Sequence, residues 1–268
     1  MLRLFRRDAS SDSPAHDRLH VLHEGQAYSV ALKRVTGARR FTLRVRAATR
    51  DVVLTMPNRG STKAALDFAQ RHAAWIAARL HRLPNAVPFR HGFIIPIRGN
   101  DHLIVHVEAA RGGIMVDDHN DEDGASPVLR VSCGAEYVPR RISDFLKREA
   151  KQDLETAVRH HTKQLGYAAR RVTVRDTTSR WGSCSASGSL NFSWRLVMSP
   201  PFVLDYLAAH EVAHLVHMNH SEKFWELTRE LAPQTDRAET WLKAHGTGLH
   251  RFGAEPNVVA PSLRTKVR

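Results

Sequence analysis

Four histidines and a glutamate lie within the stretch HEVAHLVHMNH, residues 210–220. His210 and His214 are four residues apart, so on a helix their imidazoles lie on one face, one turn apart. Two imidazoles in this arrangement can bind one zinc ion, and Glu211 lies near the same face. In the HExxH pattern the glutamate takes a proton from the metal-bound water, whose pKa zinc lowers to around 7. The spacing therefore predicts a zinc-dependent hydrolase with Glu211 as the general base.

The third metal ligand is open between several residues. His217 would lie on the same face only if the helix continued, and ligands spread over seven residues span about 10 Å, too far for bonds near 2.1 Å. His220 is better placed if the chain turns first, and Asn219 can adopt the left-handed conformation that such a turn uses. Glu230 or Glu239, from the following helices, is the other solution. Composition alone gives HExxH in roughly one such chain in twenty, and with the histidine at 220 in roughly one in three hundred, which argues against a chance match. The geometry favours His220.

Helices are predicted around this cluster from the apolar periodicity. The HExxH segment belongs to a helix that begins with Ser199 as N-cap and Pro200 in its first turn. Two shorter helices follow, over 221–231 and about 235–244. The longest candidate helix, 139–166, precedes them all.

Other segments supply strands and a further helix. Alternating or short apolar runs predict strands over 26–57, 93–97, 103–107, 114–116, 128–131, 171–175 and 190–197. STKAALDFAQRHAAWIAARLHRL, residues 61–83, predicts one helix capped by Ser61. The acidic stretch over 117–127 lacks the ligand order of an EF-hand loop and predicts a solvated hairpin loop. The fold class is α+β.

Four regions follow from these patterns. They are a flexible tail (1–20), a strand-rich region (21–135), a metal-binding catalytic region (136–248) and a basic tail (249–268).

The net charge of +13 is large and admits nucleic acid, an anionic substrate or solubility as its reason. Basic residues concentrate over 33–50, where Phe41, Leu43 and Val45 alternate with polar residues. This pattern predicts a half-buried strand with a solvated basic face. The chain shows no apolar run of the roughly 18 residues that a membrane helix needs and no apolar core of a signal peptide. Two separated cysteines favour a cytoplasmic, reduced protein.

Three linked stretches carry a resemblance to a known family: SRWGSCS (179–185), LNFSWRLVMSPP (190–201) and DYLAAHEVAHLVHMNHSEKFW (205–225). They resemble the YgjP-like metal-dependent hydrolases, which are related to the SprT-like zincins. The match is strongest over about 140–245, and Thr178 departs from it, since many members have lysine there. The spacing HExxHxxxxxH also matches metzincins, but no methionine follows Met218, so a Met-turn is missing.

The resemblance implies zinc on His210, His214 and His220, with Glu211 as catalytic base. It also implies a zincin-like core, in which a strand layer lies beside the HExxH helix after a strand-rich N-terminal region. The run 190–197 is then the candidate edge strand for pairing with an extended substrate.

Arg180 is a candidate contact for the oxyanion or an anionic substrate, and bracing of its own loop through backbone carbonyls is the favoured alternative. Trp181 and Trp225 are expected to pack, and Cys184 is expected to be structural.

Three functions remain in view. A zinc metallopeptidase acting on peptide or protein is favoured. A nucleoside triphosphate pyrophosphohydrolase acting on UTP, as some relatives are described, keeps the metal and changes the substrate. A basic nucleic-acid-binding protein with a structural metal is the third, but it would need no Glu211. None of the three implies a membrane partner.

Overall fold

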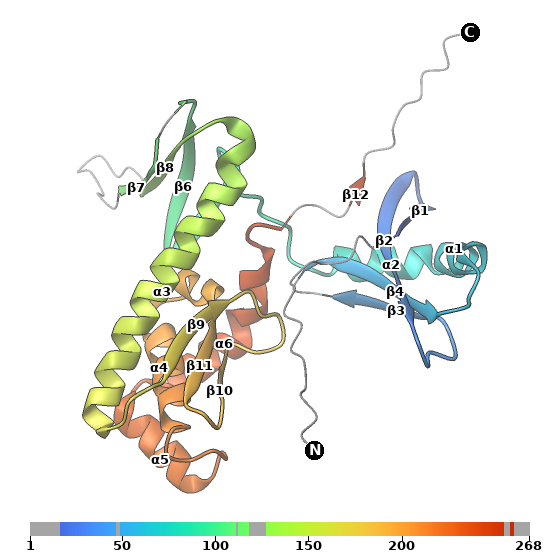
Figure 1. The fold of residues 1–268 in the computed structure, drawn as a ribbon. Coiled ribbons are helices and arrows are strands. Elements are labelled where there is room, and N and C mark those ends of the chain that lie inside the picture. Colours follow the sequence, from blue (N-terminus) through green and yellow to red (C-terminus); the bar gives the residue numbers. More distant parts are fainter. Residues whose placement is uncertain (1–16, 47–48, 111, 118–126, 255–257, 260–268) are drawn as a thin grey trace, which may run out of the picture. The chain divides into compact units, whose positions relative to one another are not determined.

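The computed structural model describes residues 17–46, 49–110, 112–117, 127–254 and 258–259 (Figure 1). Its contacts divide the chain into two compact units: residues 1–46, 50–83 and 257–268 form one, and residues 47–49 and 84–256 form the other. Both units mix helices and strands. Residues 1–16 of the tail expected over 1–20, and residues 118–126 of the expected acidic hairpin loop, lie outside the described residues.

The first unit is a sheet with two helices packed against it. Its strands are β1 (Arg18–His23), β2 (Gln26–Val35), β3 (Thr42–Arg46), β4 (Asp51–Pro57) and β12 (Val258–Val259). The order is β1-β2-β4-β3, β2 and β4 are parallel, and β12 pairs with the start of β2. In β3, Leu43 and Val45 are half-buried and Arg44 and Arg46 are exposed, which confirms the expected basic strand face. Because β1 begins at Arg18, the expected tail does not reach residue 20.

The single helix expected over 61–83 is two helices, α1 (Thr62–Arg71) and α2 (Ala73–His81). Ser61 caps α1 by accepting from the Ala64 amide. The helix is interrupted at His72, whose N–H donates to the Ala69 carbonyl in a tighter, 3₁₀-type turn.

The second unit joins two sheets through one long helix. The four-stranded sheet has the order β5 (Ile94–Ile97), β6 (Asn100–Val107), β8 (Val128–Ser132), β7 (Ile114–Asp117). The three-stranded sheet has the order β10 (Gly182–Cys184), β11 (Ser189–Ser193), β9 (Arg171–Arg175). The helices are α3 (Val138–Leu165), α4 (Pro201–Ala213), α5 (Glu222–Leu231) and α6 (Thr235–His245), with 3₁₀ turns at Ala135–Tyr137, Trp194–Met198 and Gly246–Arg251.

Helix α3 connects the two cores of this unit. Ile142 and Leu146, in its first half, pack with the four-stranded sheet, and Leu154 and Val158, further along, pack with β11 and α4. The helix ends at Gly166, whose φ of 71° is the left-handed conformation that glycine adopts without strain.

The run 190–197 is not one strand. β11 ends at Ser193, and Trp194–Met198 form a buried 3₁₀ turn that leads toward α4. β11 is also the central strand of its sheet, so the edge beside α4 is β10 and not the run 190–197. The side chains of this turn are buried in both cores. Alternating apolar residues occur wherever every second side chain is buried, so the pattern predicted a strand where the chain forms a 3₁₀ turn.

Residues 249–254 differ from the expected basic tail. Leu249 and Phe252 are buried in the core around α3. The Arg195 guanidinium donates to the carbonyls of both residues, at 3.1 and 2.8 Å. Packing against distant parts of the chain therefore orders residues 249–254, and the local sequence gives no signal for this packing. None of the described helices is long and apolar enough to span a bilayer.

His250 makes this C-terminal turn sensitive to pH. Its ring is 6% exposed and stacks on Trp181 at 5.3 Å, and burial, with Arg195 nearby, lowers its pKa from 6.5 to about 4 against a smaller opposing effect of Asp176. Between these values the unfolded chain binds the proton and the folded chain does not, so the free energy of unfolding should decrease as pH falls from 6.5 towards 4.

We expect His250→Gln to weaken this dependence, because glutamine does not titrate. The measurement is the urea midpoint of metal-free protein at pH 7 and pH 5. An equal decrease in wild type and variant would contradict the prediction.

Candidate active site

Helix α4 carries the first three residues of the cluster. It begins after Pro200, with Pro201 in the first turn, and Ser199 does not cap it because the Ser199 hydroxyl donates to the Leu196 carbonyl at 2.6 Å. The helix ends at His214, and the amide of His217 turns back to the Ala213 carbonyl at 2.9 Å.

Three imidazoles meet just beyond this helix end. One ring nitrogen from each of His210, His214 and His220 lies within 4.8 Å of the others. The Nε2 atoms of His210 and His220 are 3.2 Å apart. Asn219 is not left-handed, because it is not among the described non-glycine residues with positive φ. The chain instead turns where α4 ends, and this turn brings His220 back to the other two rings.

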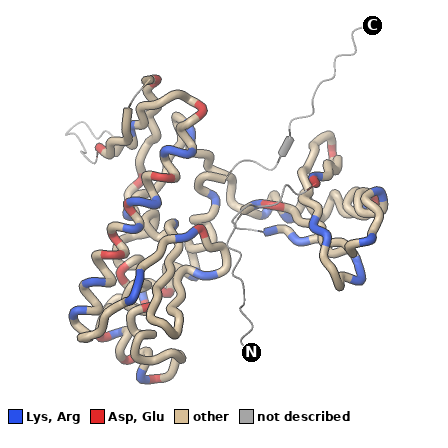
Figure 2. The backbone as a smooth tube through the Cα atoms, in the orientation of Figure 1, with Lys and Arg blue, Asp and Glu red and all other residues tan. Residues whose placement is uncertain are grey.

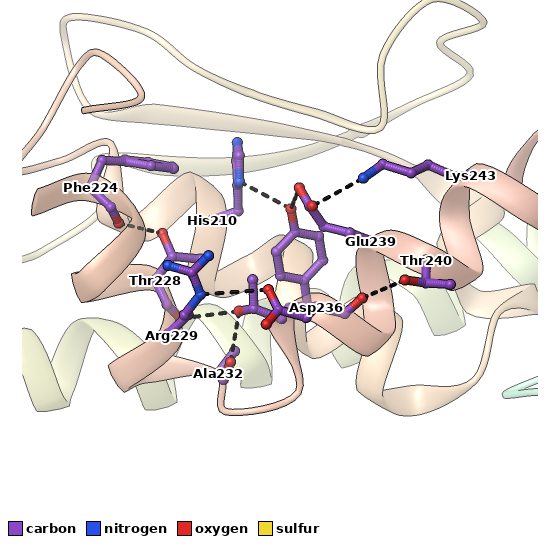
Figure 3. Close-up of polar contacts among 11 residues, drawn as sticks. His210, Phe224, Thr228, Arg229, Ala232, Asp236, Glu239, Thr240 and Lys243 are labelled. Atoms are coloured by element: carbon purple, nitrogen blue, oxygen red, sulfur yellow. Dashed lines mark hydrogen bonds and ion pairs between the residues drawn. The ribbon is translucent and has the colours of Figure 1, made fainter. Parts of the chain in front are cut away.

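The neighbours of these rings fix their orientation. The Nδ1 of His214 lies 2.9 Å from the His217 carbonyl, which leaves its Nε2 for the centre of the cluster. The Tyr206 hydroxyl lies 3.4 Å from Nδ1 of His210 and donates to Glu239 at 3.2 Å (Figure 3). Glu239 in turn accepts from Lys243 at 3.3 Å.

Phe224, fully buried at the start of α5, contacts all three imidazoles with ring centroids 4.5 to 4.9 Å away. It forms an apolar floor beneath the cluster.

The other candidate ligands lie outside the cluster. His217 contributes its backbone carbonyl and not its ring. Glu239 is engaged by Tyr206 and Lys243, and Glu230 is exposed. Among the described residues, the group of converging donors contains only His210, His214 and His220.

Electrostatics keep the buried imidazoles neutral. Burial, and then the neighbouring rings, lower the pKa of His210 to about 4, and burial also lowers the pKa of His214. A neutral imidazole has the free lone pair that a metal ligand requires. His210 and His214 are therefore available to bind a cation near neutral pH.

Glu211 lies in the last turn of α4 and is buried beneath β10. It is 4% exposed, and its Oε2 has no hydrogen-bond partner in the described chain. Burial raises its pKa to about 8, against a smaller opposing effect of Arg180. A Cβ added at Gly182 would lie 2.3 Å from the Glu211 Oε1, so glycine lets the strand lie directly on the carboxylate.

The loop before β10 places the remaining candidates. Arg180 is exposed, and its guanidinium donates to no carbonyl in the described chain, so the expected brace is absent and its charge acts on Glu211 instead. Trp181 packs against both cores, as expected. Trp225 is half-buried and stacks on His220 at 5.7 Å. Burial, and then Glu211, raise the pKa of the Cys184 thiol, which does not favour a nucleophile.

Three residues of the site were not singled out from the sequence. Tyr206 is four residues before His210, and this spacing could have placed it on the ligand face. Phe224 and Gly182 carry no such signal, because their contacts depend on how α5 and β10 pack on α4.

The side chains gathered here are those with which metalloenzymes hold a metal and move a proton, on a mixed α/β scaffold. The model of the YgjP-like family, metallopeptidase domain, matches residues 39–245, and the chain belongs to this family. At family level it is a metal-dependent peptidase, which confirms the resemblance stated above.

Comparisons with solved structures and with curated proteins do not define the function further. A crystal structure of the metallopeptidase zymogen of Pyrococcus abyssi abylysin is 25% identical and covers 34% of this chain and 95% of that chain, with a TM-score of 0.30. This TM-score is too low to show a shared fold. A comparison with curated proteins gives no match.

Proposed function

We propose that this protein is a zinc-dependent peptidase in which His210, His214 and His220 hold the metal and Glu211 is the general base. The observation that carries the proposal is the convergence of three imidazole nitrogens within 4.8 Å, on the helix that also bears Glu211. The sheet β9–β11 beside α4 fits the zincin-like core that the family resemblance implies.

The donor set fits zinc. Three imidazoles leave one position open in a tetrahedral site, as catalytic zinc requires, and they suit zinc better than calcium or magnesium. A zinc ion bound there supplies a Lewis acid that acidifies water and polarises the scissile carbonyl.

The chain's own groups then do the rest of the chemistry. Glu211 presents an unpartnered Oε2 that accepts the proton of the attacking water and returns it to the leaving amine. Tyr206 and the His217 carbonyl hold the rings of His210 and His214 in place. The outer edge of β10 has no strand partner among the described residues, and we expect an extended peptide to pair there, with Arg180 offering a cation to a developing negative charge.

A nucleoside triphosphate is the second candidate substrate. Arg180, an exposed cation next to the general base, favours it, while no phosphate-binding loop accompanies it in the sequence. The non-enzymatic alternative leaves the buried Glu211 unexplained. The two free cysteines are in keeping with the cytoplasmic location we propose.

The metal content of matched variants tests the proposal. We expect one zinc per chain in wild type and in His217→Ala, because the latter keeps its carbonyl, and zinc lost or weakened in His220→Ala. Elemental analysis after dialysis is the measurement. Zinc retained in His220→Ala would move the third ligand to a downstream carboxylate, and a wild type that binds no supplied zinc would defeat the proposal.

A further inference from the structure

A groove of about 600 Å³ runs between α3 and β9, within the second unit. Its walls come from Lys147, Arg148 and Lys151 on the helix and from the whole of β9. Figure 1 shows α3 and β9 side by side. The groove lies at the edge of the three-stranded sheet opposite β10, so it is separate from the candidate active site.

The groove carries a strong positive charge. Five of its lining residues are basic: Lys147, Arg148, Lys151, Arg171 and Arg175. Figure 2 shows Lys and Arg positions in blue along the backbone of this unit.

Little nearby charge offsets these cations. Asp176 is the one acidic residue of the described lining, and it accepts from Arg195 at 3.0 Å. Arg148 pairs with Glu149 at 3.9 Å and Lys151 pairs with Glu155 at 3.7 Å; both cations are exposed, and such pairs contribute little. Lys147, Arg171 and Arg175 have no carboxylate partner in the part of the chain that the structure describes. The groove therefore carries an excess of positive charge.

The β9 edge adds a second kind of recognition. β9 pairs in parallel with β11 through Arg171–Arg175 and with no other strand of the described chain. An unpaired edge offers backbone N–H and C=O groups to an incoming strand. Val172 and Val174, half-buried, give the groove an apolar floor.

We propose that this groove docks an extended, acidic polypeptide segment as an added strand on β9. Arg171 and Arg175 lie on one face of β9, and Val172 and Val174 lie on the other. Acidic side chains at alternate positions of the added strand then reach Arg171 and Arg175, and the apolar side chains between them cover Val172 and Val174. The cations of α3, on the other wall, add to the positive potential of the groove. The docking does not depend on the proposed metal chemistry.

Nucleic acid fits the same groove less well. Trp194 is the one aromatic residue of the described lining, and at 2% exposure it cannot stack on a base. A phosphodiester backbone can accept from the N–H groups of the β9 edge, but it has no donor for the C=O groups of that edge. An oligonucleotide is therefore one of the probes in the experiment.

The experiment is fluorescence anisotropy with the full-length chain carrying Glu211→Gln, so that no peptide is cut. The probes are a labelled (Glu-Val)₄ peptide, a (Lys-Val)₄ peptide, two (Glu-Val)₄ peptides N-methylated at alternate amides in either register, and a single-stranded oligonucleotide of equal charge. We expect (Glu-Val)₄ to bind, and one N-methylated register to bind about tenfold more weakly because it loses the edge hydrogen bonds. The lysine peptide should not bind.

Two double variants locate the site. Lys147→Ala with Arg171→Ala should weaken binding about tenfold, because both groove walls lose a cation. Arg159→Ala with Lys163→Ala removes the same charge from exposed positions of α3, the latter about 18 Å of helix rise beyond Lys151, and should change binding less than about twofold.

Equal binding by the two double variants would overturn the groove as the site. If both N-methylated peptides and the oligonucleotide bind as tightly as the parent peptide, strand addition is rejected and the surface is an unspecific polyanion site. No binding of the parent peptide above the lysine peptide also overturns the proposal.

Discussion

Glu211→Gln is expected to keep one zinc per chain and to lose hydrolysis by roughly 10³-fold, the range of a missing general base. Glutamine has nearly the same volume, so the buried site beneath β10 should stay packed. Its amide cannot accept the proton that the Oε2 of Glu211 is free to take. The zinc ligands are untouched, so metal content and activity should separate.

The assay offers an unfolded protein and UTP side by side, with zinc measured on the same samples. Glu230→Gln is the matched control, since this glutamate is exposed and was a candidate ligand. It should keep both metal and activity. Cleavage of one substrate only, lost in Glu211→Gln, identifies the substrate class. A Glu211→Gln variant that remains active would remove the general base from the mechanism.

Gly182→Ala is expected to lower kcat/KM by about 10²-fold, because a displacement near 1 Å at a reacting group can cost that much. The new Cβ would lie 2.3 Å from Oε1, 2.7 Å from Cγ and 2.8 Å from Cδ of Glu211. Either the carboxylate or β10 must move. Gly182 does not have a positive φ, so the effect arises from this contact and not from backbone strain.

Gly248→Ala is the control, because an added Cβ there meets nothing within 4 Å and its φ is also not positive. We expect Gly182→Ala to keep one zinc per chain, which separates displacement of the base from loss of the metal. Full activity in Gly182→Ala would contradict the prediction, because it would show that activity does not depend on the position of the Glu211 carboxylate beneath β10.

The sequence by itself determined those features that depend on near neighbours in the chain. The spacing of His210 and His214 places both on one face because helix geometry is local. The helices expected over 221–231 and about 235–244 and the strand over 171–175 appear as α5, α6 and β9, since their periodicity and end signals lie within each segment. The three family stretches also predicted membership of the family that the comparison shows.

The tertiary structure decided what depends on contacts between distant segments. The long apolar run 190–197 reads as a strand, but its second half is a 3₁₀ turn because both cores need it buried. The edge strand beside the site is the short β10, whose polar sequence gave no strand signal.

The position of the third imidazole, that of His220, also depends on contacts between distant segments. The residues after His214 allow several paths, and only the end of α4 and the packing of Phe224 bring His220 to the other two rings. Gly182 became part of the site through its contact with Glu211 across the sheet–helix interface. Local spacing is set by bond geometry, whereas these positions are set by which surfaces bury one another, and a single sequence does not show that pairing.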